Sequence, residues 1–136
     1  MQIDLTEKQY RRLLDMVYIG NWILNSARGE DRFADYDRLE SYLFAQASRV
    51  GMDSLTQVWR GTAYPSQAFQ QGGIHEAIAD YEDAVFYDIL AEELARRDME
   101  REGVNPDDEE DLKARMEEYF KEFEQNGVDN FRLDDN

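Results

Sequence analysis

The chain has 136 residues, of which 42% are hydrophobic and 12% aromatic, enough core-forming side chains for one folded domain. It contains no cysteine, which excludes disulfides, thiolate metal sites and cysteine nucleophiles. No stretch approaches the roughly 18 consecutive apolar residues of a membrane helix, and the start lacks a signal-peptide pattern. We therefore expect a cytoplasmic protein that makes no membrane contact.

Charge is the most unusual property of the sequence. Thirty-one acidic residues against 15 basic residues give a net charge of −16. Residues 1–51 carry eight acids and seven bases, residues 52–103 carry 11 and four, and residues 104–136 carry 12 and four. The excess lies in the C-terminal half, where it repels nucleic acid and anionic membranes and attracts a basic partner protein.

An amphipathic helix is expected first. Thr6 and Gln9 form a capping box, so this helix should begin near Glu7 and end near Gly29, which favours an antiparallel second helix after a tight turn. Gly20 lowers the local helix propensity and is expected to let another helix approach closely. The apolar or inward positions follow helical spacing: Tyr10, Leu13, Leu14, Met16, Val17, Ile19, Asn21, Ile23 and Leu24.

The second helix is expected over residues 33–51, with Gly51 as its C-cap. Its apolar positions recur every three or four residues: Phe33, Tyr36, Leu39, Leu43, Phe44, Ala47 and Val50. Asp35, Asp37 and Glu40 fall on the other side, where we expect a solvated face.

Residues 52–73 break the helical periodicity and predict an irregular link, in which Pro65 opens a short helix that ends at Gly72. Several residues of the link belong to types enriched at binding hot spots: Trp59, Arg60, Tyr64 and Phe69. The alternative is that Trp59 and Phe69 only fix the link to the core.

Residues 74–101 contain no Gly or Pro, and Gly72-Gly73 and Gly103 lie on either side of them. This range therefore predicts a long central helix. Two apolar stripes on nearly opposite sides indicate that neighbours cover both: Ile74, Ile78, Tyr81, Val85 and Ile89, and then Phe86, Leu90 and Leu94. A bend near residues 83–84 is the alternative. Asp88 and Glu92 interrupt the first stripe, so they should be exposed or paired with an arginine: Arg11, Arg12 or Arg96.

The last helix is expected to start at Asn105 as N-cap, with Pro106 in its first position and acids against the helix dipole, and to end at Gly127. Its apolar stripe is narrow: Leu112, Met116, Tyr119, Phe120 and Phe123. Residues 128–136 are expected to be extended or frayed.

These patterns predict an all-α fold, a compact four- to five-helix bundle around the helix at 74–101, with the irregular link at 52–73. We expect a single domain over residues 1–136, because one apolar core suffices for a chain of this length.

No cofactor, catalytic residue or metal ligand is predicted. His75 is the only histidine, so a zinc site would need three carboxylates beside it. The chain has no phosphate-binding glycine loop and no serine with a suitably placed base. The enzymatic alternative is a Mg²⁺-dependent hydrolase like the helical nucleotide pyrophosphatases, since carboxylates three or four apart share a helix face. The pairs that fit are Asp37/Glu40, Asp80/Asp83 and Asp88/Glu92.

Several short motifs lie between residues 5 and 100: Leu14-x-x-Val17-Tyr18-Ile19-Gly20-Asn21-Trp22, Tyr36-x-x-Leu39-Glu40-x-Tyr42, His75-Glu76, Phe86-Tyr87-Asp88 and Leu94-Ala95-x-Arg97-Asp98. In these motifs the chain resembles a set of short acidic helical proteins of bacteria and prophages that have no known activity. The resemblance implies a helical fold and no functional residue.

The sequence thus favours a non-enzymatic interaction protein whose acidic C-terminal half docks on a basic, nucleic-acid-binding surface of a partner protein. In charge and size the chain is similar to small acidic inhibitors encoded by phages. A homodimer formed through the aromatic link is a further alternative. The predicted partner contacts are Trp59, Arg60, Tyr64, Asp83, Glu93, Glu110, Glu117 and Glu118.

Overall fold

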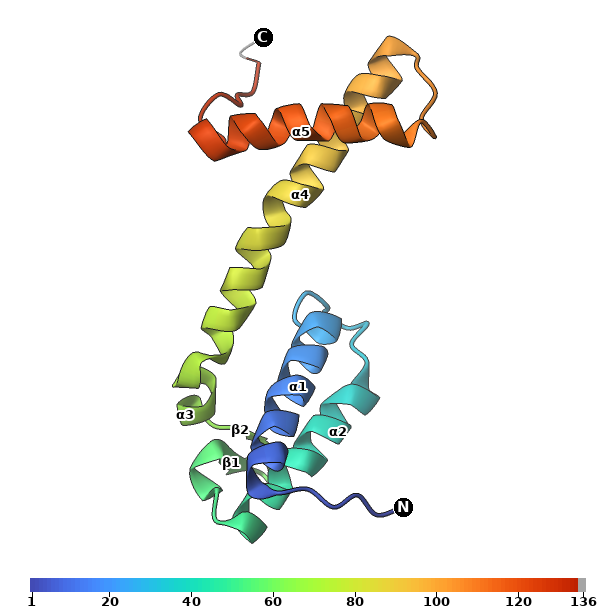
Figure 1. The fold of residues 1–136 in the computed structure, drawn as a ribbon. Coiled ribbons are helices and arrows are strands. Elements are labelled where there is room, and N and C mark those ends of the chain that lie inside the picture. The colour runs from blue at the N-terminus through green and yellow to red at the C-terminus, as the bar shows by residue number, and fades with distance from the viewer. Residues whose placement is uncertain (135–136) are drawn as a thin grey trace. The chain divides into compact units, whose positions relative to one another are not determined.

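The computed structural model describes residues 1–134 and is mostly helical, with one two-stranded sheet (Figure 1). The long helices are α1 (Glu7–Asn25), α2 (Ala34–Phe44), α4 (His75–Glu102) and α5 (Glu109–Asn126). Between α2 and α4 lie the 3₁₀ turns Ala45–Val50 and Asp53–Leu55, strands β1 (Thr56–Trp59) and β2 (Thr62–Pro65), the short helix α3 (Gln67–Phe69) and the π turn Gln70–Ile74. The helical class is confirmed, but the all-α prediction is wrong.

The chain divides into two compact units. The first unit, Met1–Ile78, contains α1, α2, the sheet, α3 and the first turn of α4, and the second unit, Ala79–Asn136, contains the rest of α4, α5 and the tail. A single domain over residues 1–136 stays a prediction, and each unit is described by itself below.

Helix α1 begins as predicted. The backbone N–H of Gln9 donates to Thr6 Oγ1 at 3.1 Å, and Gln9 Oε1 accepts from the backbone N–H of Thr6 at 2.9 Å, which completes the capping box. The helix ends earlier than Gly29, because the side chain of Asn25, only 1% exposed, bonds both the N–H and the carbonyl oxygen of Phe33. These bonds turn the chain towards α2.

Aromatic side chains build the core of the first unit. Phe69 of α3 lies edge-on to Tyr18 of α1, with ring centroids 5.3 Å apart, and to Phe44 of α2 at 4.9 Å. The Tyr10 hydroxyl donates to the carbonyl oxygen of Leu43 at 2.6 Å and ties α1 to α2. The buried cluster comprises Tyr10, Leu14, Tyr18, Phe44, Ala47, Phe69, Ile74 and Ile78.

Several residues predicted to be buried on the first two helices are exposed instead: Met16, Ile23, Phe33, Tyr36, Leu39 and Val50. Helix α2 contacts α1 on one side and β2 on another, which covers only part of each apolar face. The apolar stripe of a helix is therefore wider here than the surface its neighbours bury.

The link at 52–73 is ordered around a β-hairpin. Trp59 pairs with Thr62, so only Arg60 and Gly61 form the turn, with φ of 48° and 79°. Two positive φ values are typical of a type I′ turn, whose twist matches that of the strands. Pro65 ends β2 instead of opening a helix, and α3 starts after Ser66, whose Oγ accepts from the backbone N–H of Phe69 at 3.1 Å.

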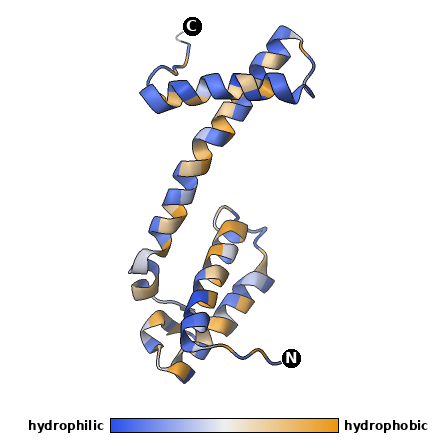
Figure 2. Ribbon diagram, in the orientation of Figure 1, coloured by the Kyte–Doolittle hydropathy of each residue, from blue (hydrophilic) through white to orange (hydrophobic). Residues whose placement is uncertain are grey.

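Helix α4 matches the predicted range closely and runs without the alternative bend at residues 83–84. In the second unit, Ala91, Ala95 and Met99 are buried, while Tyr81, Phe86 and Ile89 are exposed. The expectation that both apolar stripes are covered is therefore wrong. Figure 2 shows hydrophobic residues interspersed with hydrophilic ones along the length of this helix.

Phe123 of α5 is the buried aromatic residue of the second unit, and its ring lies 5.0 Å from that of Tyr87. Asp108, not Asn105, caps α5 by accepting from the backbone N–H of Asp111 at 3.1 Å. Gly127 ends the helix as predicted, with φ of 56°.

Part of the C-terminal tail is folded onto α5. The Phe131 ring lies 5.5 Å from that of Phe123 and 6.3 Å from that of Tyr119. The tail is therefore not frayed at Phe131, and residues 135–136 of the predicted tail lie outside the described residues.

Two glycine substitutions should have opposite effects on stability. Gly20 is exposed and an added Cβ meets no heavy atom within 4 Å, so the expected close helix approach is wrong, and Gly20→Ala should stabilise the fold by about 0.5–1 kcal/mol. Gly73 has φ of 106°, so Gly73→Ala should destabilise it by about 1–2 kcal/mol. Urea unfolding followed by fluorescence tests both, since Trp22 and Trp59 lie in the first unit. Equal shifts would contradict the backbone argument.

Trp59 and Phe69, which the alternative interpretation of the link fixes to the core, differ in burial. Phe69 is 1% exposed and Trp59 is 61% exposed, so fixation to the core is confirmed for the first and wrong for the second. We expect Phe69→Ala to destabilise the first unit by about 3–5 kcal/mol and Trp59→Ala by less than about 0.5 kcal/mol. Urea unfolding monitored by circular dichroism measures both, and a large loss in Trp59→Ala would show that the hairpin tip is buried.

Candidate functional site

The negative charge is concentrated in the second unit. Residues 1–78 contain ten acids and eight bases, a net charge of −2, whereas residues 79–136 contain 21 acids and seven bases, a net charge of −14. The boundary between the units therefore coincides with a change from a nearly neutral to a strongly anionic chain.

Few carboxylates of the second unit are neutralised by neighbouring cations. The ion pairs of its described residues are Arg96 with Glu92, Arg97 with Asp98, Arg115 with Asp111 and Glu102, and Lys121 with Glu118. The Glu92–Arg96 pair, at 2.9 Å, confirms one predicted partner, whereas Asp88 is exposed and forms no ion pair within residues 1–134. Most acids of this unit therefore face solvent with their charge uncompensated.

Five of the predicted contact residues lie on this anionic unit, and all five are exposed: Asp83, Glu93, Glu110, Glu117 and Glu118. Among them, Glu118 forms an exposed ion pair with Lys121, and the other four form none within the described chain. The carboxylates of these four are available to an incoming cation without first breaking an internal ion pair.

The other three predicted contacts lie on the hairpin. The Arg60 guanidinium carbon lies 5.3 Å from the centre of the Trp59 ring, a cation–π contact at an exposed tip. The strand register places Tyr64 beside Gln57, on the same sheet face as Trp59. The structure thus groups an exposed Trp, Arg and Tyr within one short hairpin, and these three residue types are enriched at binding hot spots.

A hydrogen-bonded polar cluster joins α1 to α2. The Asn21 amide donates to Asp37 Oδ1 at 3.0 Å and to Glu40 Oε2 at 2.8 Å, while Arg32 forms two bonds with Asp37 at 2.9 and 3.0 Å. The Asn25 amide extends this series of hydrogen bonds by donating to Asn21 Oδ1 at 2.6 Å. The predicted solvated face is therefore wrong for Glu40, whose carboxylate is largely buried, whereas the Asp37 side chain is 37% exposed.

This cluster forms one wall of a cavity of about 290 Å³. Two bonds from Arg32 hold the pKa of Asp37 below its usual value, whereas burial and, secondarily, the charge of Asp37 raise the pKa of Glu40. The cavity is lined by Tyr18, Asn21, Trp22, Asn25, Ser26, Arg32, Asp37, Glu40, Ser41 and Tyr64. Sequence reasoning missed the roles of Arg32 and Asn25, although Asn21 and Asn25 stand one helical turn apart.

Metal ligation by this cluster lacks a third ligand. Within residues 1–134, no group of three or more histidine, aspartate or glutamate side chains is arranged to hold a metal ion. Between Asp37 and Glu40 the structure places the donor nitrogen of Asn21, where a cation shared by the two carboxylates would sit. The Mg²⁺-dependent hydrolase stays a prediction without structural support.

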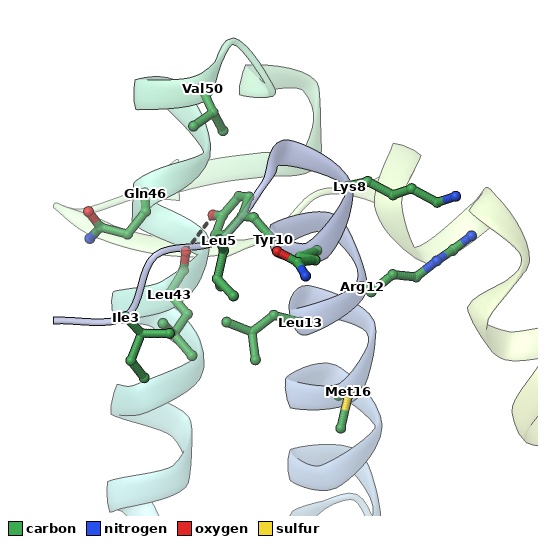
Figure 3. Close-up of a pocket in the computed structure, with 11 residues that line it drawn as sticks. Ile3, Leu5, Lys8, Tyr10, Arg12, Leu13, Met16, Leu43, Gln46 and Val50 are labelled. Carbon is green, nitrogen blue, oxygen red and sulfur yellow. Dashed lines mark hydrogen bonds between the residues drawn. The ribbon is translucent and has the colours of Figure 1, made fainter.

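An open apolar groove runs between α1 and the end of α2, with a volume of about 690 Å³ (Figure 3). The cationic side chains of Lys8 and Arg12 extend on the α1 side, away from α2. The groove is lined by Ile3, Leu5, Lys8, Gln9, Tyr10, Arg12, Leu13, Met16, Leu43, Gln46 and Val50. Several of these residues were predicted to be core, so an amphipathic pattern alone did not distinguish a groove from an interior.

No known family, no curated protein and no solved structure matches this chain. Among the described residues, no helix combines the length and apolarity that a membrane span requires.

Asp37 and Glu40 should affect the pH dependence of unfolding free energy in opposite directions. The folded state raises the pKa of Glu40, so its ionisation destabilises the fold as pH rises through the folded pKa, and the effect is absent below the ordinary glutamate pKa of about 4.3. Glu40→Gln, which can still accept from Asn21, should therefore stabilise the first unit at pH 7 and not at low pH.

Asp37→Asn is the matched comparison. The pKa of Asp37 is lowered, so its contribution is present above the ordinary aspartate pKa and is lost as pH falls through the folded pKa. This variant should destabilise the first unit by about 1 kcal/mol at pH 7. Tryptophan fluorescence during urea unfolding at several pH values measures both, and parallel pH profiles would contradict the assignment.

Proposed function

We propose that this protein is a non-enzymatic interaction protein whose acidic second unit binds a basic, nucleic-acid-binding surface of a partner protein. The proposal rests on one observation: 21 acids and seven bases lie in residues 79–136, and most of the described carboxylates there form no ion pair. An inhibitor of the phage or prophage type acts in this way, and we place the interaction in the cytoplasm, where such partners work.

The physical basis is substitution of carboxylates for phosphates. A surface that binds nucleic acid presents lysine and arginine side chains to a regular array of negative charges. Helices α4 and α5 carry exposed carboxylates on rigid backbones, and such an array attracts the same cations and raises the rate of association. A tight complex would then prevent the partner from binding nucleic acid.

The hairpin is proposed as an additional contact. Charge alone confers weak, salt-sensitive binding, whereas Trp and Tyr supply apolar contact area that excludes water. Trp59, Arg60 and Tyr64 are exposed together at the hairpin, so they suit this second role.

Binding to purified histones, used as a basic probe protein, should depend on where the acids lie and not only on their number. The triple variant Glu93→Gln, Glu110→Gln and Glu117→Gln should weaken binding at least tenfold at low salt, because these exposed carboxylates have no internal partner. Binding of the unsubstituted protein should also weaken steeply as salt rises. Fluorescence anisotropy of labelled protein measures both.

The matched control removes three exposed acids from the first unit: Asp4→Asn, Glu30→Gln and Asp53→Asn. Both triple variants lose three negative charges, so net charge is equal. If the control weakens binding as much as the test variant, or if salt has no effect on either, the anionic unit is not the binding surface.

A further inference from the structure

The apolar groove of the first unit is an uncovered surface with a cationic edge. Met16, at one end of the α1 side, is 72% exposed, and Leu13 is half-buried beside it. Lys8 forms no ion pair within the described chain, and Arg12 reaches only Asp15, at 3.5 Å. The groove therefore offers apolar contact area and two cations with little internal compensation (Figure 3).

Helix α4 carries a surface with the opposite charge. Tyr81 and Ile89 are 62% and 59% exposed, and with the half-buried Val85 they form a stripe at four-residue spacing. The stripe spans about 12 Å along the helix. Glu82 and Asp88 flank it on either side and form no ion pair within residues 1–134.

We propose that the groove of one copy receives the Tyr81–Ile89 stripe of α4 from a second copy. An amphipathic helix that binds in an apolar groove is a common mode of recognition, in which side chains about one helical turn apart make the contacts. The flank that carries Glu82, or in the opposite direction of the incoming helix the flank that carries Asp88, then lies against the cationic edge that Lys8 and Arg12 form on the α1 side. The apolar surfaces match in kind and the flanking charges are opposite in sign.

Charge also decides which surface covers the stripe. Pairing α4 with a second α4 would place the carboxylates of two anionic units against each other, which costs several kcal/mol for unscreened like charges. The groove lies in the nearly neutral first unit and presents cations instead. Since every chain carries both surfaces, reciprocal exchange makes each contact twice and closes a symmetric dimer. This dimer goes beyond the proposed function and does not depend on it.

Sedimentation equilibrium of the full chain at up to about 100 μM, in about 0.15 M salt, tests the proposal. The unsubstituted protein should have the mass of two chains at high concentration. Met16→Glu and Ile89→Glu, both at exposed positions, should each raise the dimer dissociation constant at least tenfold, with unchanged helical circular dichroism. A protein that stays monomeric would overturn the proposal.

Charge exchange tests the pairing directly. Lys8→Glu with Arg12→Glu should weaken the dimer about tenfold, and adding Glu82→Lys with Asp88→Lys should restore it, because the complementarity is then reversed and not lost. No rescue would mean that these charges do not meet.

Val58→Glu is the matched control. Val58 is an exposed apolar residue on β1, outside both proposed surfaces, so this variant should leave the dimer unchanged. It also separates the groove from the alternative homodimer through the aromatic link: loss of the dimer in Val58→Glu, with none in Met16→Glu, would assign the interface to the hairpin and overturn the groove. None of these results alters the histone experiment, whose triple variant leaves Lys8, Arg12, Glu82 and Asp88 intact.

Discussion

The first unit depends on the burial of Phe69. Its ring lies edge-on to Tyr18 and Phe44, and the Arg11 guanidinium carbon lies 4.8 Å from its centre. One side chain from α3 thus joins the two long helices to the segment that follows the hairpin. The Ser66 hydroxyl accepts from the backbone N–H of Phe69 and donates to the carbonyl oxygen of Ser54 at 2.5 Å. Ser66 therefore links the start of α3 to the residues just before the hairpin. An aromatic core of this kind leaves the hairpin tip free for contact.

The polar cluster at the C-terminal end of α1 has a different role. Asn25, Asn21 and Arg32 satisfy one another and the two acids of α2, so hydrogen bonds specify the turn between α1 and α2 together with the contact of Arg28 on the Phe33 ring. Buried polar groups that are fully bonded favour one arrangement over its competitors, since any other leaves a donor unsatisfied. In the described chain, no buried side-chain nitrogen or oxygen lacks a partner.

The two units differ most in their net charge. The first unit is nearly neutral and carries an open apolar groove, whereas the second carries most of the negative charge on α4 and α5. Burial of Ala91 and Ala95 allows close helix packing in the second unit, and leaves its large apolar residues Tyr81, Phe86 and Ile89 at the surface. Both proposed interactions, with a basic partner and with a second copy, arise from this division between apolar and anionic surface.

The sequence by itself determined the features that are local. The capping box at Thr6, the glycine ends at Gly51 and Gly127 and the Gly-free run of α4 each act within a few residues, so helix positions and the charge asymmetry could be predicted. The hairpin was missed because each strand has only four residues, too few to display a clear two-residue alternation, and Arg60-Gly61 is not one of the usual hairpin turn pairs. Only the tertiary structure decided which apolar residues are covered and that Asn21 joins Asp37 to Glu40, because both depend on which surfaces meet. Helical periodicity shows which side of a helix is apolar, and it contains no information on whether a neighbour is present to bury that side.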